Sequence, residues 1–212
     1  MRGKGFRTRL RLLIVLTLLL VMLTSVAVGK YMQTASFEGK VTFSANLATN
    51  IILRESKLER DSDGNYELSD TKYVSGSQEY VLIPGVDVPK NPHIIIEGKT
   101  NVGAYLFVEV VSTVDADKLI YSVDDSLWKK LNLTGKHDGD VYVYTGSGNT
   151  PLVMTSTPAN PIYILQGNKI TVSQHIGCKE NWNDALTFYA SMGDTAINDS
   201  VSEIYKAIHA MS

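Results

Sequence analysis

The residue types that could do chemistry are present, but their spacing matches no standard catalytic or metal-binding pattern. No serine stands in the G-x-S-x-G setting of a nucleophile elbow. The four histidines are scattered and none forms H-E-x-x-H, the pattern of a zinc protease helix; they are His93, His137, His175 and His209. Because zinc sites need ligands at short, defined spacings, we expect no catalytic residue, no metal and no cofactor.

Two acidic clusters come closest to a ligand set. Asp61, Asp63 and Asn65 have the oxygen spacing of a calcium loop, but Glu67 comes too early to be its bidentate final ligand. We therefore interpret this stretch as a solvated hairpin turn around Gly64. The second cluster could supply the paired carboxylates of a glycosidase, but no aromatic array can be placed beside it, which favours a charged loop; it contains Asp115, Asp117, Asp124 and Asp125.

The first 27 residues have the pattern of a secretory signal peptide. Five basic residues precede the apolar run Leu12–Leu23, and small residues then lead to a predicted cleavage between Ala27 and Val28. A retained membrane anchor is the alternative, because the run extended through Val28 approaches the about 20 residues of a spanning helix. We expect cleavage and therefore a secreted or cell-surface protein.

The chain after the signal is acidic and has no possible internal disulfide. Residues 28–212 carry 15 basic and 22 acidic side chains, a formal charge of −7. Such a charge argues against nucleic acid as a partner. The only cysteine, Cys178, is interpreted as a small buried or half-buried residue. Stability must then come from apolar burial rather than from disulfides.

Thr34–Leu47 alternates as a half-buried strand does. Its apolar side contains Phe37, Val41, Phe43, Ala45 and Leu47. Since this is the first strand after the signal, it can pair with its own sheet or complete the sheet of another molecule. The pattern alone leaves both open, and in the second case these five residues are the donor side chains.

The remaining chain indicates about nine or ten strands at short spacing, as in an all-β sandwich or barrel. Val102–Val111 is the most apolar run, with both parities apolar, which predicts a strand covered on both faces. Its positions Leu106, Val108 and Val110 are our candidates for an acceptor groove. Further along, residues 161–176 read as a hairpin turning at Gly167 and Asn168.

An amphipathic helix is predicted over residues 200–211. Apolar residues recur at helical spacing from Val201, and Ser200 with Glu203 forms a capping box. About eleven residues are too few for a stable isolated helix, so this helix must dock on the sandwich or on a partner.

Several segments, in order, resemble the TasA/camelysin family of exported bacterial surface proteins. The stretches "VGKYMQTASFEGKVTFSANLATNIIL" and "LTFYASMGDTAINDSVSEIYKAI" are similar to the family's start and end. The most specific similarity lies in "PGVDVPKNPHIIIEGKTNVGAYLFVEV" and rests on Pro84, Gly85, Lys90, Pro92, Ala104 and Tyr105.

The resemblance implies a jelly-roll-like sandwich, processing by a dedicated signal peptidase, and a place in the extracellular or biofilm matrix. It also implies head-to-tail self-assembly into fibres through donation of the N-terminal strand, with other matrix proteins as further partners. The domain plan is then a signal at 1–27, a donor segment at 28–47 and a sandwich at 48–212. The alternatives are a secreted metalloprotease, as some relatives are catalogued, and a monomeric cell-surface binding module.

Overall fold

The computed structural model describes residues 33–43, 49–98, 103–134, 138–173, 185–195 and 200–210. The predicted signal peptide, its cleavage site at Ala27 and Val28, and Cys178 lie outside these ranges. Within them, no helix combines the length and apolar character needed to cross a membrane.

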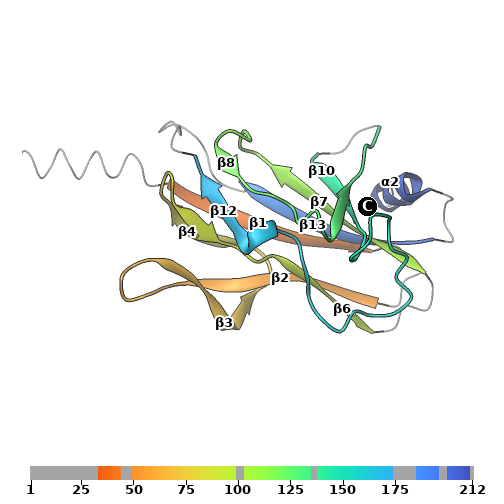
Figure 1. Ribbon diagram of the computed structural model, residues 1–212, viewed down its shortest axis with the longest axis horizontal. Helices are drawn as coiled ribbons and strands as arrows, with labels where there is room; N and C mark the ends of the chain where they lie inside the picture. The colour runs from red at the N-terminus through yellow and green to blue at the C-terminus, as the bar shows by residue number, and fades with distance from the viewer. Residues whose placement is uncertain are drawn as a thin grey trace, which may run out of the picture.

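Strands dominate the described chain and form three sheets (Figure 1). The largest has six strands in the order β4 (Gln78–Leu82), β1 (Gln33–Phe43), β13 (Leu186–Asp194), β7 (Ala104–Ser112), β10 (Asp140–Tyr144) and β9 (Trp128–Lys130). All its neighbouring strands are antiparallel except β1 and β13, which run parallel.

The second and third sheets are smaller. The second has the order β11 (Ile162–Tyr163), β6 (His93–Gly98), β2 (Thr49–Arg60) and β3 (Tyr66–Val74). The third has the order β5 (Asp87–Pro89), β12 (Lys169–Val172) and β8 (Leu119–Ile120). A 3-10 turn, η1 (Gln166–Asn168), precedes β12.

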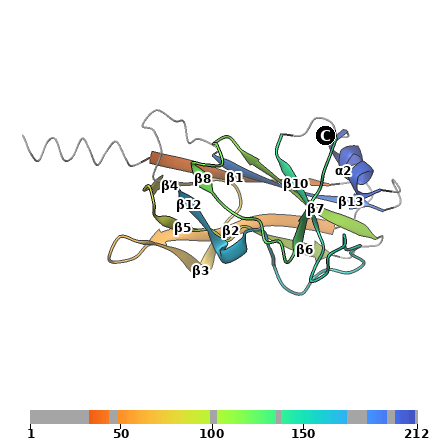
Figure 2. The same cartoon turned by 45° about the horizontal axis from the view of Figure 1, so that its top comes forward.

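The six-stranded and four-stranded sheets face each other as the two layers of a sandwich (Figures 1 and 2). Every second residue of β2 and β6 points into the space between them, as the strand period requires. The main core is therefore shared by Leu53 and Ile94 from one sheet and by Leu106, Val108 and Met192 from the other. The prediction of an all-β sandwich with a short C-terminal helix is confirmed.

The strand β7 is buried on both faces, as its composition predicts. Leu106, Val108 and Val110 face the main core, whereas Phe107 belongs to a second cluster on the opposite face. The helix α2 (Val201–Ala210) covers that opposite face, where Ile204 and Tyr205 pack against Phe107 and β10 (Figure 2). The helix thus docks on its own sandwich.

A hydrogen bond fixes this docking. The Tyr205 hydroxyl donates to Glu109 Oε2 at 2.8 Å, while Glu109 Oε1 accepts the backbone N–H groups of Asp138 and Gly139 at 3.0 and 2.9 Å. A side chain at Gly139 would collide with the Val110 carbonyl, at 2.3 Å from an added Cβ. The glycine therefore allows β10 to approach β7 beside the Glu109 carboxylate.

The hairpin predicted over 161–176 is wrong. The chain does turn at Gly167 and Asn168, both with positive φ, but β11 pairs with β6 whereas β12 pairs with β5 and β8. The turn therefore carries the chain from the four-stranded sheet, which contains β11, to the three-stranded sheet, which contains β12. The predicted turn at Asp61 is a hairpin turn, with Asp61 Oδ1 accepting the N–H groups of Asp63 and Asn65 at 2.9 and 2.8 Å.

Stability is expected to fall steeply above pH 10. Burial raises the pKa of Tyr121 to about 12 and also raises those of Tyr142 and Tyr144; for Tyr205, burial and the bond to Glu109 raise the pKa further. In this range the folded chain holds protons that the unfolded chain, with tyrosine pKa values near 10, releases. Alkali therefore favours unfolding between pH 10 and 12.

Urea unfolding at pH 8 and pH 11 measures this effect. Tyr205→Phe keeps the ring packing but removes the hydroxyl, so it should cost about 1–2 kcal/mol at pH 8 and show a smaller drop at pH 11. Equal pH slopes for the variant and the parent chain would contradict the assignment to Tyr205.

Candidate functional site

The first described strand, β1, lies between β4 and β13 and pairs with both of them, whereas β4 and β13 do not pair with each other. Gln33–Phe37 pair antiparallel with β4, and Phe37–Phe43 pair parallel with β13, so the two stretches share only Phe37. β1 is therefore the connection between β4 and the rest of the six-stranded sheet. In the single chain this strand pairs with its own sheet.

The neighbour β13 depends on β1 for its second edge. Its other edge is paired with β7 along its whole length, from Leu186 with Ser112 to Asp194 with Ala104. All of β13 except Tyr189 is buried. Buried backbone groups are nearly always hydrogen-bonded, so the edge from Leu186 to Met192 needs a partner strand, and β1 is that partner.

The register aligns three strands at the candidate donor and acceptor positions. Val41 lies opposite Ala190, which lies opposite Val108, and Phe43 lies opposite Met192. β13 thus separates β1 from the acceptor candidates Leu106, Val108 and Val110, which are buried in the core. Phe37 lies opposite Leu186, and the donor candidates Ala45 and Leu47 fall outside the described residues.

The other neighbour, β4, is held by one buried glutamine. Gln78 Nε2 donates to Glu55 Oε1 at 2.6 Å and to the Ser56 carbonyl at 3.1 Å, and Gln78 Oε1 accepts the Leu58 N–H at 2.9 Å. The last bond fits a register irregularity of β2 between Ser56 and Leu58, where the ladder leaves backbone groups for a side chain to bind. β1 thus lies between two strands that have other contacts to hold them: β13 pairs with β7, and β4 is bound to β2 through Gln78.

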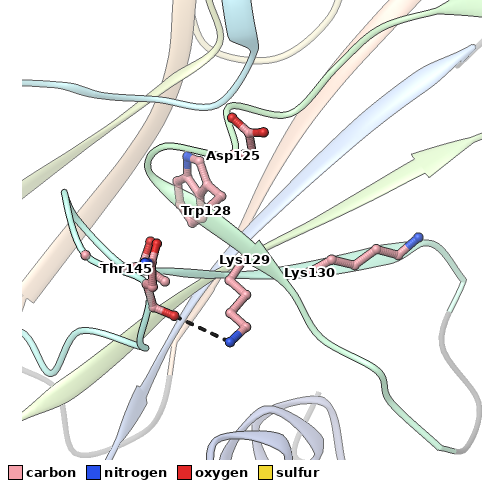
Figure 3. Close-up of a pocket in the computed structure, with 7 residues that line it drawn as sticks. Asp125, Trp128, Lys129, Lys130 and Thr145 are labelled. Atoms are coloured by element: carbon pink, nitrogen blue, oxygen red, sulfur yellow. Dashed lines mark hydrogen bonds between the residues drawn. The ribbon is translucent and has the colours of Figure 1, made fainter.

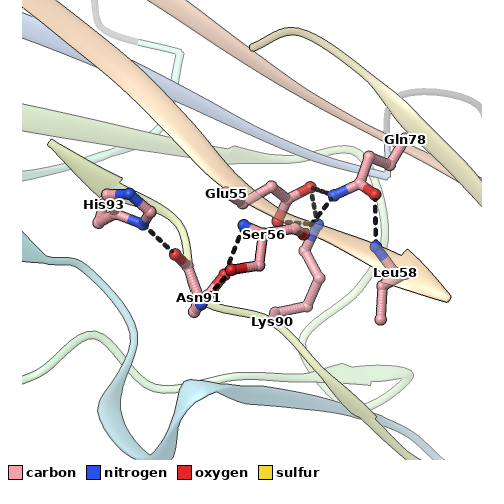
Figure 4. Close-up of polar contacts among 7 residues, drawn as sticks. All are labelled: Glu55, Ser56, Leu58, Gln78, Lys90, Asn91 and His93. Atoms are coloured by element: carbon pink, nitrogen blue, oxygen red, sulfur yellow. Dashed lines mark hydrogen bonds and ion pairs between the residues drawn. The ribbon is translucent and has the colours of Figure 1, made fainter. Parts of the chain in front are cut away.

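A buried ion pair completes this cluster (Figure 4). Lys90 is fully buried and its Nζ contacts the carboxylate of Glu55, which is 6 % exposed. Loss of hydration lowers the pKa of Lys90, against the raising effect of Glu55. Separating such a pair is costly, because either partner alone would be a buried charge without a counter-charge.

Polar contacts continue from this cluster to the outer face of the sheet (Figure 4). Asn91 Oδ1 accepts the Ser56 N–H at 2.8 Å, and the Asn91 carbonyl lies 2.8 Å from His93 Nδ1. Arg54 Nε donates to His93 Nε2 at 3.3 Å, so the imidazole is neutral, with its hydrogen on Nδ1. Burial accordingly lowers the pKa of His93.

An open hollow beside β9 offers no convergent chemistry (Figure 3). Asp125, Trp128, Lys129 and Lys130 line it, but both lysines are engaged: Lys129 Nζ donates to the Asn149 carbonyl at 3.4 Å and Lys130 pairs with Asp140 at 2.7 Å. The Trp128 indole is buried and donates to the Tyr163 carbonyl. These side chains support the local fold.

No group of three or more His, Cys, Asp or Glu side chains suited to a metal occurs within the described part of the chain. Of the four histidines, His93 is buried and His209 stacks on Tyr205 at 4.4 Å between ring centroids. His137 and His175 lie outside the described residues.

The cluster of Lys90, Glu55 and Gln78 was not predicted from the sequence. One signal for it exists: Glu55 continues the inward parity of Ile51 and Leu53, which puts a carboxylate where an apolar residue is expected. In the sequence, Lys90 is part of the family-like motif and carries no further signal of a buried charge. Its partner, Lys90, is 35 residues away in the sequence. Strand periodicity predicts which face a side chain lies on, but not which distant residue it contacts.

The fold defines a class of all-β sandwiches with a short C-terminal helix, in which the first described strand, β1, pairs with the last described strand, β13. No protein-family model, no curated protein and no solved structure matches the chain.

Proposed function

We propose that this protein is a secreted bacterial structural protein of the TasA/camelysin type, with a jelly-roll-like sandwich, that assembles head to tail into extracellular fibres. In the fibre, β1 of one copy occupies the β1 position of the next. The proposal is supported above all by one observation: β13 is buried and its second edge is paired by the first described strand, β1, while β13 is also held by β7 and β4 by Gln78.

Strand exchange conserves every contact. A β1 strand from another copy would bring the same residues to Leu186–Met192 in the same register, so the exchange costs little in interaction energy. Because the donor and acceptor surfaces of one copy are different, the contact does not close on itself and generates a filament.

The segment after β1 is short, so its length limits how far β1 can reach. Residues 44–48 join β1 to β2 in the facing sheet, and five residues span at most about 18 Å. Packed sheets lie about 10 Å apart.

A cysteine pair tests whether β1 is donated. In a Cys178→Ser chain beginning at Val28, Val41→Cys and Ala190→Cys place two thiols at registered positions of neighbouring strands, where a disulfide or short crosslinker can join them. Oxidised fibres should give a ladder of covalent multimers on a non-reducing denaturing gel. A monomer band from assembled material would show that each copy keeps its own β1 and would end the proposal.

The matched control uses a pair that always belongs to one chain. Thr187→Cys with Val111→Cys joins β13 to β7, and it should give monomers whether or not fibres form. Electron microscopy of the same samples shows whether fibres are present. A chain that stays monomeric in both assays and forms no fibres would contradict fibre assembly and favour the monomeric alternative.

A further inference from the structure

We infer that Lys90 and Gln78 form an intramolecular amide crosslink, with Glu55 as the proton-transfer group. The three side chains meet at one buried point between β2, β4 and the segment preceding β6 (Figure 4). The inference concerns this chain's own covalent structure and stands apart from fibre assembly.

Lys90 has the setting of an amine nucleophile. Its side chain is fully buried, which disfavours the ammonium form, and its Nζ contacts the Glu55 carboxylate. Transfer of one proton from Nζ to Glu55 converts the ion pair into a neutral amine beside a neutral acid. Buried lysines act as nucleophiles in this neutral form.

Gln78 has the setting of an acyl acceptor. Its amide oxygen accepts the Leu58 N–H at 2.9 Å, and a backbone donor at this position stabilises negative charge on the oxygen during attack. Its Nε2 donates to Glu55 Oε1 at 2.6 Å, so the same carboxyl group contacts the nucleophile and the leaving group.

Proximity favours the reaction. Lys90 Nζ and Gln78 Nε2 both lie within hydrogen-bond distance of Glu55 Oε1, which places them at most about 5 Å apart. The Cδ atom of Gln78 is one bond from Nε2. A small rotation of either side chain brings Nζ toward the 3–3.5 Å at which such groups react.

The bonds and protons balance without another reactant. Neutral Lys90 Nζ attacks Cδ of Gln78 and forms the Nζ–Cδ bond, while the carbonyl oxygen takes up negative charge against the Leu58 N–H. Glu55 gives its proton to Nε2 and receives one from Nζ. The Cδ–Nε2 bond breaks, ammonia leaves, and Glu55 ends as it began.

The crosslink would join β4 to the chain just before β6 in a protein with a single cysteine. It closes a loop from residue 78 to residue 90, and loop closure of this length stabilises a fold as a disulfide does. It would also fasten the strand that pairs with Gln33–Phe37 of β1.

Intact-mass spectrometry of the denatured chain, expressed from Val28, tests the inference. The mass should fall below the sequence mass by about 17 Da, the mass of ammonia, and tandem spectra should show one branched peptide joining Lys90 to Gln78. A mass equal to that of the sequence would overturn the inference. A branched peptide between Lys90 and Glu55, with a deficit of about 18 Da for water, would overturn the choice of Gln78.

Two variants separate chemistry from packing. Gln78→Glu keeps the shape of the acceptor but releases water, so its deficit should change from about 17 to about 18 Da. Glu55→Gln removes the proton-transfer group and should restore the full sequence mass. A 17 Da deficit that persists in Glu55→Gln at the same site would contradict the role of Glu55.

Discussion

In a chain that has not crosslinked, Lys90 and Glu55 are an ion pair, and replacing Lys90 by methionine is expected to lower the free energy of unfolding by about 3–5 kcal/mol, the range for breaking a buried ion pair from one side. Methionine fills similar space but leaves the Glu55 carboxylate, 6 % exposed, without its cation. The strand β4 should loosen as well, because Gln78 binds the same carboxylate. Chemical denaturation of the chain from Val28, followed by circular dichroism, measures the loss.

A double variant separates the buried charge from the lost side-chain volume. In Lys90→Met with Glu55→Gln, the residue at position 55 is neutral and still offers an oxygen to Gln78. At least about 2 kcal/mol of the loss should return, because uncharged residues replace buried ion pairs at little cost. The deficit that remains relative to the parent chain reports the other buried contacts of Lys90, together with the crosslink where the parent chain has formed it. A single variant that costs less than about 1 kcal/mol would contradict the ion pair's importance.

The parts of the fold that follow from local patterns could be predicted. β7 is apolar in both parities and is buried on both faces. The terminal helix needed a surface for its apolar stripe and found one on β7 and β10. In each case the information lies within a dozen consecutive residues, where side-chain period determines which faces must be covered.

Partner choice could not be predicted in the same way. Residues on either side of Gly167 and Asn168 have the composition of a hairpin, yet β11 and β12 join different sheets. A turn with positive φ reverses the chain but does not require the flanking strands to pair. Pairing depends on which edges are open nearby, and β6 and β5 offer those edges.

The same limit applies to the candidate site. The alternation of Thr34–Leu47 predicts a strand with one apolar side, but it is equally compatible with pairing in its own sheet and in a neighbour's. The structure adds the identity of the complementary edge, Leu186–Met192, and the parallel direction of the pairing. It also adds the buried cluster at Gln78, which fixes β4 by interactions that no periodicity encodes.

A chain that begins at residue 44, and therefore lacks β1, is expected to form no fibres and to lose at least about 4 kcal/mol of stability, because each backbone hydrogen bond lost contributes about 0.5–1.5 kcal/mol. The edge of β13 and the facing edge of β4 lose their common partner. A synthetic peptide of residues 33–43 should restore the stability but not the fibres, since a peptide has no body to extend the filament.

Register defines the matched peptides for this experiment. Val41→Asp puts a carboxylate opposite Ala190, which is fully buried, whereas Lys40→Asp puts one opposite the half-buried Tyr189. We expect the first peptide to fail and the second to bind within about tenfold of the parent peptide, because an unpaired buried charge costs several kcal/mol. Fluorescence anisotropy of labelled peptides measures the affinities. Equal binding by both aspartate peptides would mean that β1 does not occupy this register, and fibres formed by the truncated chain would remove strand donation as the basis of assembly.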